Sequence, residues 1–139
     1  MSFDWVKDIA EMQYKYGVKA WMLENQDDKE KMRKYLEFRI NFLREELDET
    51  QKAFAESDPE EIVDGLIDLC VVAIGTLDAY GINPYTAWDQ VLKANMNKEV
   101  GVKPGRPNPL GLPDLIKPAG WTSPDHSDNT GILTRVFNK

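Results

Sequence analysis

Residues 58–81 read DPEEIVDGLIDLCVVAIGTLDAYG, and this stretch decides the fold. Asp58 is a good helix N-cap, Pro59 suits the first helical position and Glu61 follows as a capping-box partner. Gly81 is a stop signal after residue 80. We therefore predict a helix over 58–80. A buried β-strand is the competing interpretation, because β-branched residues are frequent here, but the length and the caps favour a helix.

Three further helices are predicted on either side of this one. Apolar side chains recur at helical spacing over 2–16 and over 29–56, and Asn83-Pro84 repeats the cap-then-proline signal before a helix over 85–98. Residues 99–139 hold six of the eight prolines and five of the nine glycines, which predicts a long, loop-rich tail. We thus expect a helical core over 1–98 and a C-terminal extension over 99–139 that packs on the core or on a partner subunit.

The segment 66–77 is apolar on nearly every side and so must be covered on every side. Four helices of one short chain do this poorly. We therefore expect an all-α fold, a bundle of about four helices that is completed by dimerisation, as a homodimer or a dimer of dimers.

Composition excludes several classes of protein. The formal charge of −7 disfavours binding to nucleic-acid polymers. One cysteine and one histidine provide neither a disulfide framework nor a Cys/His zinc cluster. The N-terminus lacks the pattern of a signal peptide, and the longest apolar stretch is too short to span a bilayer. A cytoplasmic location with no membrane partner is expected.

Carboxylates on the helix over 29–56 are the first candidates for a functional site. Glu46 and Glu49 are three residues apart and so share one face, directly beside the apolar stripe of Leu43 and Leu47. Like charges at this spacing repel each other unless a cation lies between them. The alternative interpretation is a solvated helix face.

Asp68 favours the cation site over the solvated face, because it lies in the middle of the most apolar segment, where an unpaired carboxylate is costly. Asp64 lies one turn earlier on the same face. Two acids opposite two more from a neighbouring helix form an oxygen-only site for a hard cation, Mg²⁺ with Mn²⁺ as a substitute. The alternative is a buried ion pair of Asp68 with a basic side chain, namely Arg39, Arg44 or Lys93.

Three other groups have two interpretations each. Glu61 is a fifth ligand or only a capping residue, and Glu45 is a second-metal ligand or the base that orients a water molecule. Near the end of the helix over 85–98 lie Lys93, Asn95 and Lys98. Cations are favoured at a helix C-terminus in any case, but these side chains could also bind phosphate oxygens.

The ordered motifs resemble those of the all-α nucleoside triphosphate pyrophosphohydrolases, and in particular the MazG-like proteins of phages and some bacteria. Glu45-Glu46-x-x-Glu49 matches their EExxE motif, and the segment from Asp64 to Asp68 takes the place of their ExxD motif. The segments 12–18 (MQYKYGV), 91–98 (VLKANMNK) and 117–124 (KPAGWTSP) are similar to their FHxxFG, VHRxNMxK and KPxGWxPP segments.

The resemblance implies a role for each matched residue. Glu46, Glu49 and Asp68 fall on metal-ligand positions, Glu45 on a position that holds a second metal or activates water, and Lys93, Asn95 and Lys98 on substrate-phosphate positions. The chain departs from ExxD at Gly65, where a glutamate is expected, and Asp64 is the natural replacement. A register with Glu61 and Asp64 as the ExxD pair is the alternative, but the apolar run that follows Asp68 argues against it.

We accordingly expect a magnesium-dependent hydrolase that converts a (deoxy)nucleoside triphosphate to the monophosphate and pyrophosphate, with a role in the nucleotide pool. The base would pack against aromatic side chains such as Trp21, Tyr35 and Trp121. The cytoplasm would be that of a host cell if the chain is phage-encoded. Two rivals are an enzyme of the same fold that acts on phosphoribosyl-ATP and a non-catalytic helical dimerisation module.

Overall fold

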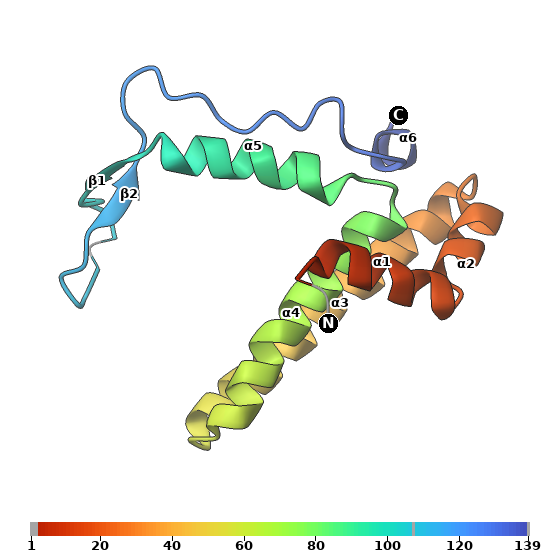
Figure 1. Cartoon of the computed structure of the whole chain (residues 1–139), viewed down its shortest axis with the longest axis horizontal. Helices are drawn as coiled ribbons and strands as arrows, with labels where there is room; N and C mark the ends of the chain where they lie inside the picture. The colour runs from red at the N-terminus through yellow and green to blue at the C-terminus, as the bar shows by residue number, and fades with distance from the viewer. Residues whose placement is uncertain (1–2, 107, 139) are drawn as a thin grey trace. The chain divides into compact units, whose positions relative to one another are not determined.

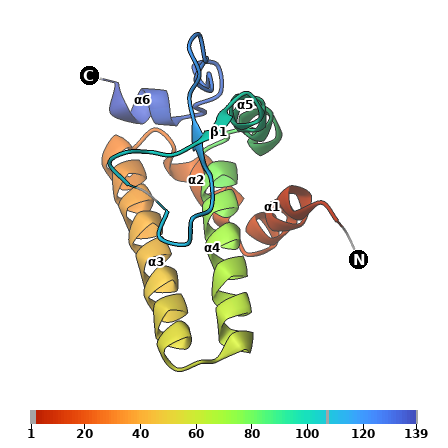
Figure 2. The same cartoon turned by 90° about the vertical axis from the view of Figure 1, so that its left-hand side faces the viewer.

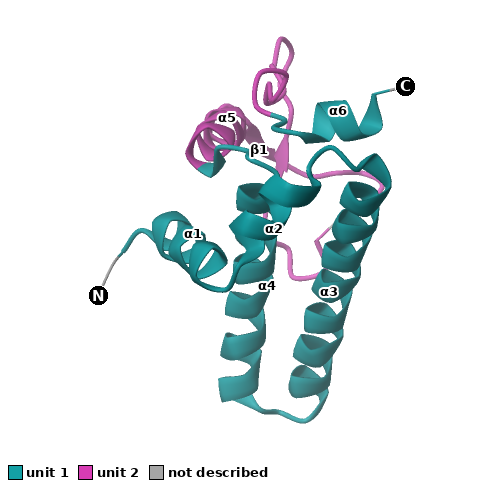
Figure 3. Cartoon of the chain, turned by 90° about the vertical axis from the view of Figure 1, so that its right-hand side faces the viewer, with its two compact units in different colours: residues 1–84, 130–139 teal, residues 85–129 magenta. Residues whose placement is uncertain are grey.

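The computed structural model of the chain describes residues 3–106 and 108–138, and helices account for 63% of it (Figure 1). This confirms the all-α fold. The chain divides into two compact units, residues 1–84 with 130–139 and residues 85–129 (Figure 3). Helix α5 thus groups with the tail in space, while the predicted division at residue 98 stays a prediction. No helix in the described ranges is long and apolar enough to cross a membrane.

The first unit contains five helices within the described residues: α1 (Trp5–Lys15), α2 (Val18–Asn25), α3 (Lys29–Ala55), α4 (Pro59–Ala79) and α6 (Leu133–Phe137). Helices α3 and α4 form a long antiparallel hairpin, and α1 packs against α4 (Figure 2). The predicted N-cap of α4 is present, since the Asp58 side chain accepts a hydrogen bond from the Glu61 amide at 3.2 Å. Gly81 adopts a φ of 71°, which ends the helix.

Helix α2 was not predicted as a helix of its own. Gly17 ends α1 as expected, with a φ of 82°, and α2 begins directly after it. Its apolar residues are contiguous rather than periodic, so the sequence carries no helical signal there. The predicted start of the first helix, Ser2, lies outside the described residues.

The core of this unit lies at the end of the hairpin where α4 stops. Tyr80 is 1% exposed, and its hydroxyl donates a hydrogen bond to the carbonyl of Met32, which is fully buried. Met22 of α2 and Val136 of α6 pack into the same cluster. The C-terminal segment is fixed there by a hydrogen bond from the Ile132 amide to the Tyr80 carbonyl, at 3.0 Å.

One arginine connects the two helices of the hairpin. Arg39 of α3 donates from Nε to Thr76 Oγ1 at 2.9 Å and from Nη2 to the Val72 carbonyl at 3.0 Å. Gly75 leaves room for this guanidinium, because a Cβ at residue 75 would lie only 3.0 Å from Arg39 Nη2. Gln13 of α1 also bonds to α4 here, because its Nε2 donates to the Gly75 carbonyl at 3.0 Å.

The second unit consists of helix α5 (Pro84–Met96), whose first residue is counted with the first unit, and the tail that follows it. Strands β1 (Glu99–Gly101) and β2 (Asp114–Ile116) pair antiparallel, with Val100 opposite Leu115. The chain then returns along α5, where Trp121 Nε1 donates to the Ala94 carbonyl at 2.7 Å. The tail is therefore anchored to its own helix.

Candidate functional site

The hairpin of α3 and α4 brings four of the predicted carboxylates within electrostatic reach of one another. Glu46 and Glu49 project from α3, and Asp64 and Asp68 from α4. Helical spacing places each pair on one face, and the two helices run antiparallel side by side (Figure 2). The charges of Asp64 and Asp68 act on Glu46 across this hairpin. The four charges therefore act on one another, while their role as metal ligands stays a prediction.

Glu46 is the carboxylate on which the charges of the other three all act. Burial raises the pKa of its carboxyl group, and the negative charges of Asp68, Glu49, Asp64 and Glu45 raise this pKa further. Its Oε2 atom is buried and has no hydrogen-bond partner among the described residues. A buried acceptor without a donor is costly, so this oxygen is suited to a ligand that the chain itself does not supply.

Asp68 behaves in the same way from the opposite helix. Burial raises its pKa, as do the charge of Asp64, a hydrogen bond with the Asp64 side chain, and the charge of Glu49. All of these causes disfavour the ionised form of Asp68. The two helices therefore hold repelling acids together.

No basic side chain neutralises this cluster within residues 3–106 and 108–138. The ion pairs formed there involve none of Glu46, Glu49, Asp64 and Asp68. Arg39, one of the alternative partners of Asp68, is instead bonded to Thr76 and Val72. The ion-pair interpretation of Asp68 is thus not seen in the described part of the chain.

Whether these residues suit a divalent cation can be judged from their chemistry. The donors are all oxygen, which Mg²⁺ and Mn²⁺ prefer, and their charges repel one another without a cation. Within the described ranges, no three carboxylate, histidine or cysteine side chains lie close enough together to hold a metal ion in their present positions. The donor set therefore fits the ion, while a closed ligand sphere requires small side-chain movements, and the metal site stays a prediction.

Two acids at the border of the cluster differ from its members. Glu45 is exposed on α3 and contributes to the raised pKa of Glu46. Glu61 is exposed in the first turn of α4, where its amide is capped by Asp58. It is not among the charges that raise the pKa of Glu46 or Asp68. The Asp58 amide donates to the Ala53 carbonyl at 2.9 Å, so the Glu61 side chain is not its capping-box partner in the described structure.

Gly65 lies beside Asp64, and its lack of a side chain predicts a close approach of the neighbouring helix, which the structure confirms. Gly65 is buried where α4 packs against Thr50 of α3. A Cβ at residue 65 would overlap Thr50 Oγ1 and lie 3.2 Å from Thr50 Cβ. Thr50 Oγ1 itself donates to the Glu46 carbonyl at 2.8 Å. The missing glutamate of the ExxD motif therefore corresponds to a point where the two helices approach too closely for a side chain.

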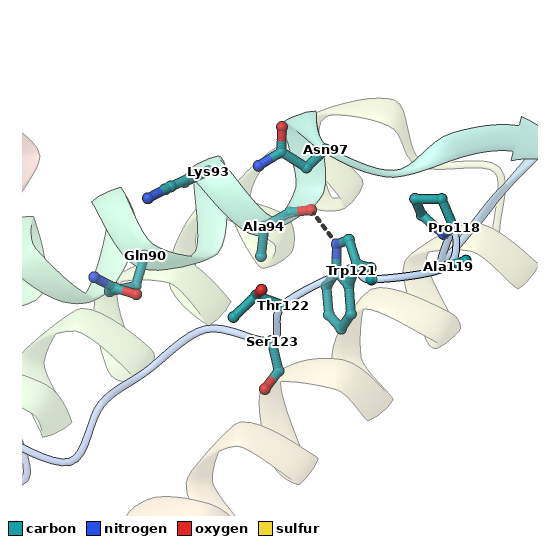
Figure 4. A pocket seen from close by; sticks show the side chains of 10 residues that line it. Gln90, Lys93, Ala94, Asn97, Pro118, Ala119, Trp121, Thr122 and Ser123 are labelled. Carbon is teal, nitrogen blue, oxygen red and sulfur yellow. Dashed lines mark hydrogen bonds between the residues drawn. The ribbon is translucent and has the colours of Figure 1, made fainter.

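The three predicted phosphate-binding residues belong to the second unit. Lys93 and Asn95 are exposed on α5, and Lys98, which follows this helix, is half-buried. Lys93 lines a pocket between α5 and residues 118–123 (Figure 4), whereas Asn95 is outside that lining as far as the chain is described. Lys98 Nζ lies 5.5 Å from the centre of the Trp121 ring.

Glu46, Glu49, Asp64 and Asp68 form an acidic seam in the α3–α4 hairpin, and the comparison with known families places the chain among the pyrophosphohydrolases of the MazG-like superfamily. A family model described as "Phosphoribosyl-ATP pyrophosphohydrolase" matches residues 21–95, more than half of the chain, including all four seam carboxylates. The chain belongs to this family of phosphoanhydride hydrolases, and the MazG-like resemblance holds at the level of the superfamily. No curated protein and no solved structure matches it.

The acidic seam predicts how stability changes with pH when no metal is bound. The folded state raises the pKa of Glu46 and of Asp68, so it binds their protons more tightly than the unfolded state does. Stability from these groups is therefore greatest at low pH and falls as pH rises through their ordinary and then their raised pKa values. In EDTA, urea unfolding of the wild type should lose stability between about pH 4 and pH 7 relative to the Glu46→Gln/Asp68→Asn variant.

The paired comparison cancels the contribution of carboxylates elsewhere, including Asp114 and Asp125, whose pKa values are lowered by hydrogen bonds. Adding Mn²⁺ at pH 7 should raise the melting temperature of the wild type and not of the variant. A stability difference between the two proteins that is constant across this pH range would contradict the prediction.

Proposed function

We propose that the chain is a metal-dependent hydrolase that cleaves a nucleoside triphosphate, ribo or deoxy, between the α and β phosphorus atoms, giving the monophosphate and pyrophosphate. The observation that carries this proposal is the uncompensated acidic seam of α3 and α4 in a member of a pyrophosphohydrolase family. A triphosphate is itself highly negative, so this seam can receive it only together with cations. Such an enzyme would clean or bias a nucleotide pool.

Each group has a proposed part in the reaction. Glu46, Glu49, Asp64 and Asp68 would hold Mg²⁺, or Mn²⁺ in its place. When bound, such an ion neutralises phosphate charge and lowers the pKa of an attacking water molecule. Glu45, which is exposed beside Glu46, would orient that water and accept its proton. Lys93, Asn95 and Lys98 would contact phosphate oxygens of the substrate.

Phosphoribosyl-ATP is the second candidate substrate, and the family match favours it at least as much as a free nucleotide. Both candidates carry the same triphosphate group, so the proposed roles of the seam carboxylates apply to either. They differ in whether the adenine carries a second phosphorylated sugar. The preference between them would therefore depend on contacts to the base, away from the acidic seam.

We also propose that a second copy of the chain completes the bundle. Exposed apolar side chains follow the outer faces of both hairpin helices: Ile40, Leu47 and Phe54 on α3, and Val63, Leu66 and Ile67 on α4. Leu66 is 51% exposed although it belongs to α4, the most apolar segment of the chain. Phe54 of α3 is 76% exposed. Ile40, Leu47 and Phe54 are seven residues apart and so share one face of α3, and an exposed apolar face of a helix is typical of a protein interface.

The experiment is an assay of pyrophosphate release with Mg²⁺ and a panel of ribo- and deoxynucleoside triphosphates, with phosphoribosyl-ATP alongside. We expect turnover that depends on the metal and is lost in EDTA. Faster turnover of phosphoribosyl-ATP than of any free nucleotide would make the second candidate the substrate. Absence of turnover with every nucleotide, together with no thermal shift in Mn²⁺, would support the non-catalytic dimerisation module instead.

A further inference from the structure

The second unit contains a pocket of about 300 Å³ between α5 and residues 118–123 (Figure 4). Two hydrogen bonds hold its walls together. Trp121 Nε1 donates to the Ala94 carbonyl at 2.7 Å, and the Asp125 amide donates to Gln90 Oε1 at 3.0 Å. The tail is therefore tied to the helix beside the pocket, so the cavity is a formed feature of this unit. Its volume is at the lower end of the range for small-molecule sites.

Polar side chains line both walls of the pocket, from α5 and from the tail (Figure 4). Its polar lining consists of one ammonium group, two amides and two hydroxyls: Lys93, Gln90, Asn97, Thr122 and Ser123. No carboxylate belongs to this lining among the described residues, although the chain as a whole has a charge of −7. Residues 85–129 contain as many basic as acidic side chains, so the acidic excess lies in the first unit.

The apolar part of the lining is an indole ring with small neighbours. Trp121 lines the pocket together with Ala94 and Pro118. Two further ammonium groups lie near the ring, with Lys117 Nζ 4.9 Å and Lys98 Nζ 5.5 Å from its centre. An aromatic surface next to clustered ammonium groups suits a ligand that has both a flat ring and a negative charge.

The end of α5 would ordinarily repel an anion, because its last carbonyl oxygens are partly negative. Here these oxygens accept hydrogen bonds. The Lys93 carbonyl accepts from the Asn97 amide at 3.2 Å, and the Asn95 carbonyl accepts from the Lys98 amide at 3.1 Å. The Ala94 carbonyl accepts from the Trp121 indole. This capping lowers the barrier to a negative group beside Lys93.

We propose that this pocket binds a nucleotide, with the phosphate on Lys93, Asn97 and the hydroxyl groups and with the base against Trp121. The inference rests on the proposed function for the class of ligand, and it goes beyond it by assigning Gln90, Asn97, Thr122 and Ser123 to a site with Lys93. The amide and hydroxyl donors serve phosphate oxygens, which Lys93 attracts as a point charge.

The test measures binding without turnover, on the full chain in EDTA. The probes are nucleoside monophosphates, the matching nucleosides and pyrophosphate, and the readouts are calorimetry and the indole N–H resonance of Trp121. We expect monophosphates to shift this resonance and to bind at least about tenfold more tightly than nucleosides or pyrophosphate alone. No shift with any probe at about 10 mM, or equal affinity for pyrophosphate and monophosphates, would overturn the proposal.

A matched pair of lysine variants tests the assigned residues. Lys93→Gln should weaken monophosphate binding about tenfold, because it removes the one charged donor in the lining. Lys103→Gln removes a lysine of the same unit that pairs instead with Asp114, at 3.9 Å, and should leave the affinity unchanged. An equal loss in both variants would mean that only net charge matters and would overturn the site.

The two proposals fail separately. Metal-dependent pyrophosphate release without any effect of nucleotides on Trp121 leaves the proposed function standing and overturns the pocket assignment. Nucleotide binding in EDTA that is lost in Lys93→Gln, without turnover in Mg²⁺, supports the pocket and removes the hydrolase. Because Lys93 is exposed, its substitution does not endanger folding.

Discussion

Asp68→Asn should abolish pyrophosphate release while leaving the metal-free protein as stable as the wild type or more stable. Burial and the neighbouring charges of Asp64 and Glu49 raise the pKa of Asp68, so its ionised form is unfavourable in the folded protein. Asparagine keeps the shape of the side chain and removes this repulsion. It also removes a proposed cation ligand, so we expect about a thousandfold loss of rate.

The measurements are the rate with Mg²⁺ and the melting temperature in EDTA and in Mn²⁺. Asp48→Asn is the matched control, since Asp48 is exposed on α3 and takes no part in the raised pKa of Glu46 or Asp68. It should change neither the rate nor the thermal shift. An Asp68→Asn variant that unfolds but binds Mn²⁺ as tightly as before would show that Asp68 serves the fold and not the metal.

Local signals in the sequence were sufficient for the long helices. The Asp58-Pro59 start and the Gly81 stop predicted α4 to within one residue at each end, and the periodic residues of 29–56 predicted α3. Helix α6 escaped prediction because its five residues lack any amphipathic signal. Its order depends on Val136, which is 3% exposed in a core that the C-terminal segment reaches from far along the chain.

For the candidate site, too, spacing along each helix was predictable from the sequence and the particular contacts between helices were not. Spacing along each helix put Glu46 with Glu49 and Asp64 with Asp68, and the packing of α3 on α4 then brought the pairs within electrostatic reach. Contacts between helices could not be read from spacing. The bond from Arg39 to Thr76 and the approach of Gly65 to Thr50 depend on the depth and register of the packing, which are tertiary properties.

The contact between Gly65 and Thr50 explains why this chain departs from the ExxD pattern. A glutamate at residue 65 would have to displace Thr50, whose hydroxyl is bonded to the Glu46 carbonyl at 2.8 Å. The close approach of the helices therefore removes one ligand position. It leaves Asp64, whose charge raises the pKa of Asp68, as the second acid of α4. The geometry of the seam thus depends on the absence of a side chain at residue 65.

Gly65→Ala should accordingly lower both stability and Mn²⁺ affinity, although alanine is the better helix former. The intrinsic gain in a helix interior is about 1 kcal/mol, whereas overpacking a tight contact costs about 1–3 kcal/mol, so a net loss is expected. Separating α3 from α4 at this point would also move Glu46 away from Asp64 and Asp68. Urea unfolding in EDTA measures the first effect, and the thermal shift with Mn²⁺ measures the second.

A second substitution, at residue 50, should reverse the sign of the stability change caused by Gly65→Ala. In a Thr50→Gly background both the hydroxyl and the Cβ that a Cβ at residue 65 would meet are gone, so Gly65→Ala should turn from destabilising to stabilising by up to about 1 kcal/mol. The double variant should also recover part of the Mn²⁺ affinity that Gly65→Ala loses. If Gly65→Ala stabilises the protein equally in both backgrounds, the helices do not meet at Thr50, and the proposed reason for the altered acidic motif is wrong.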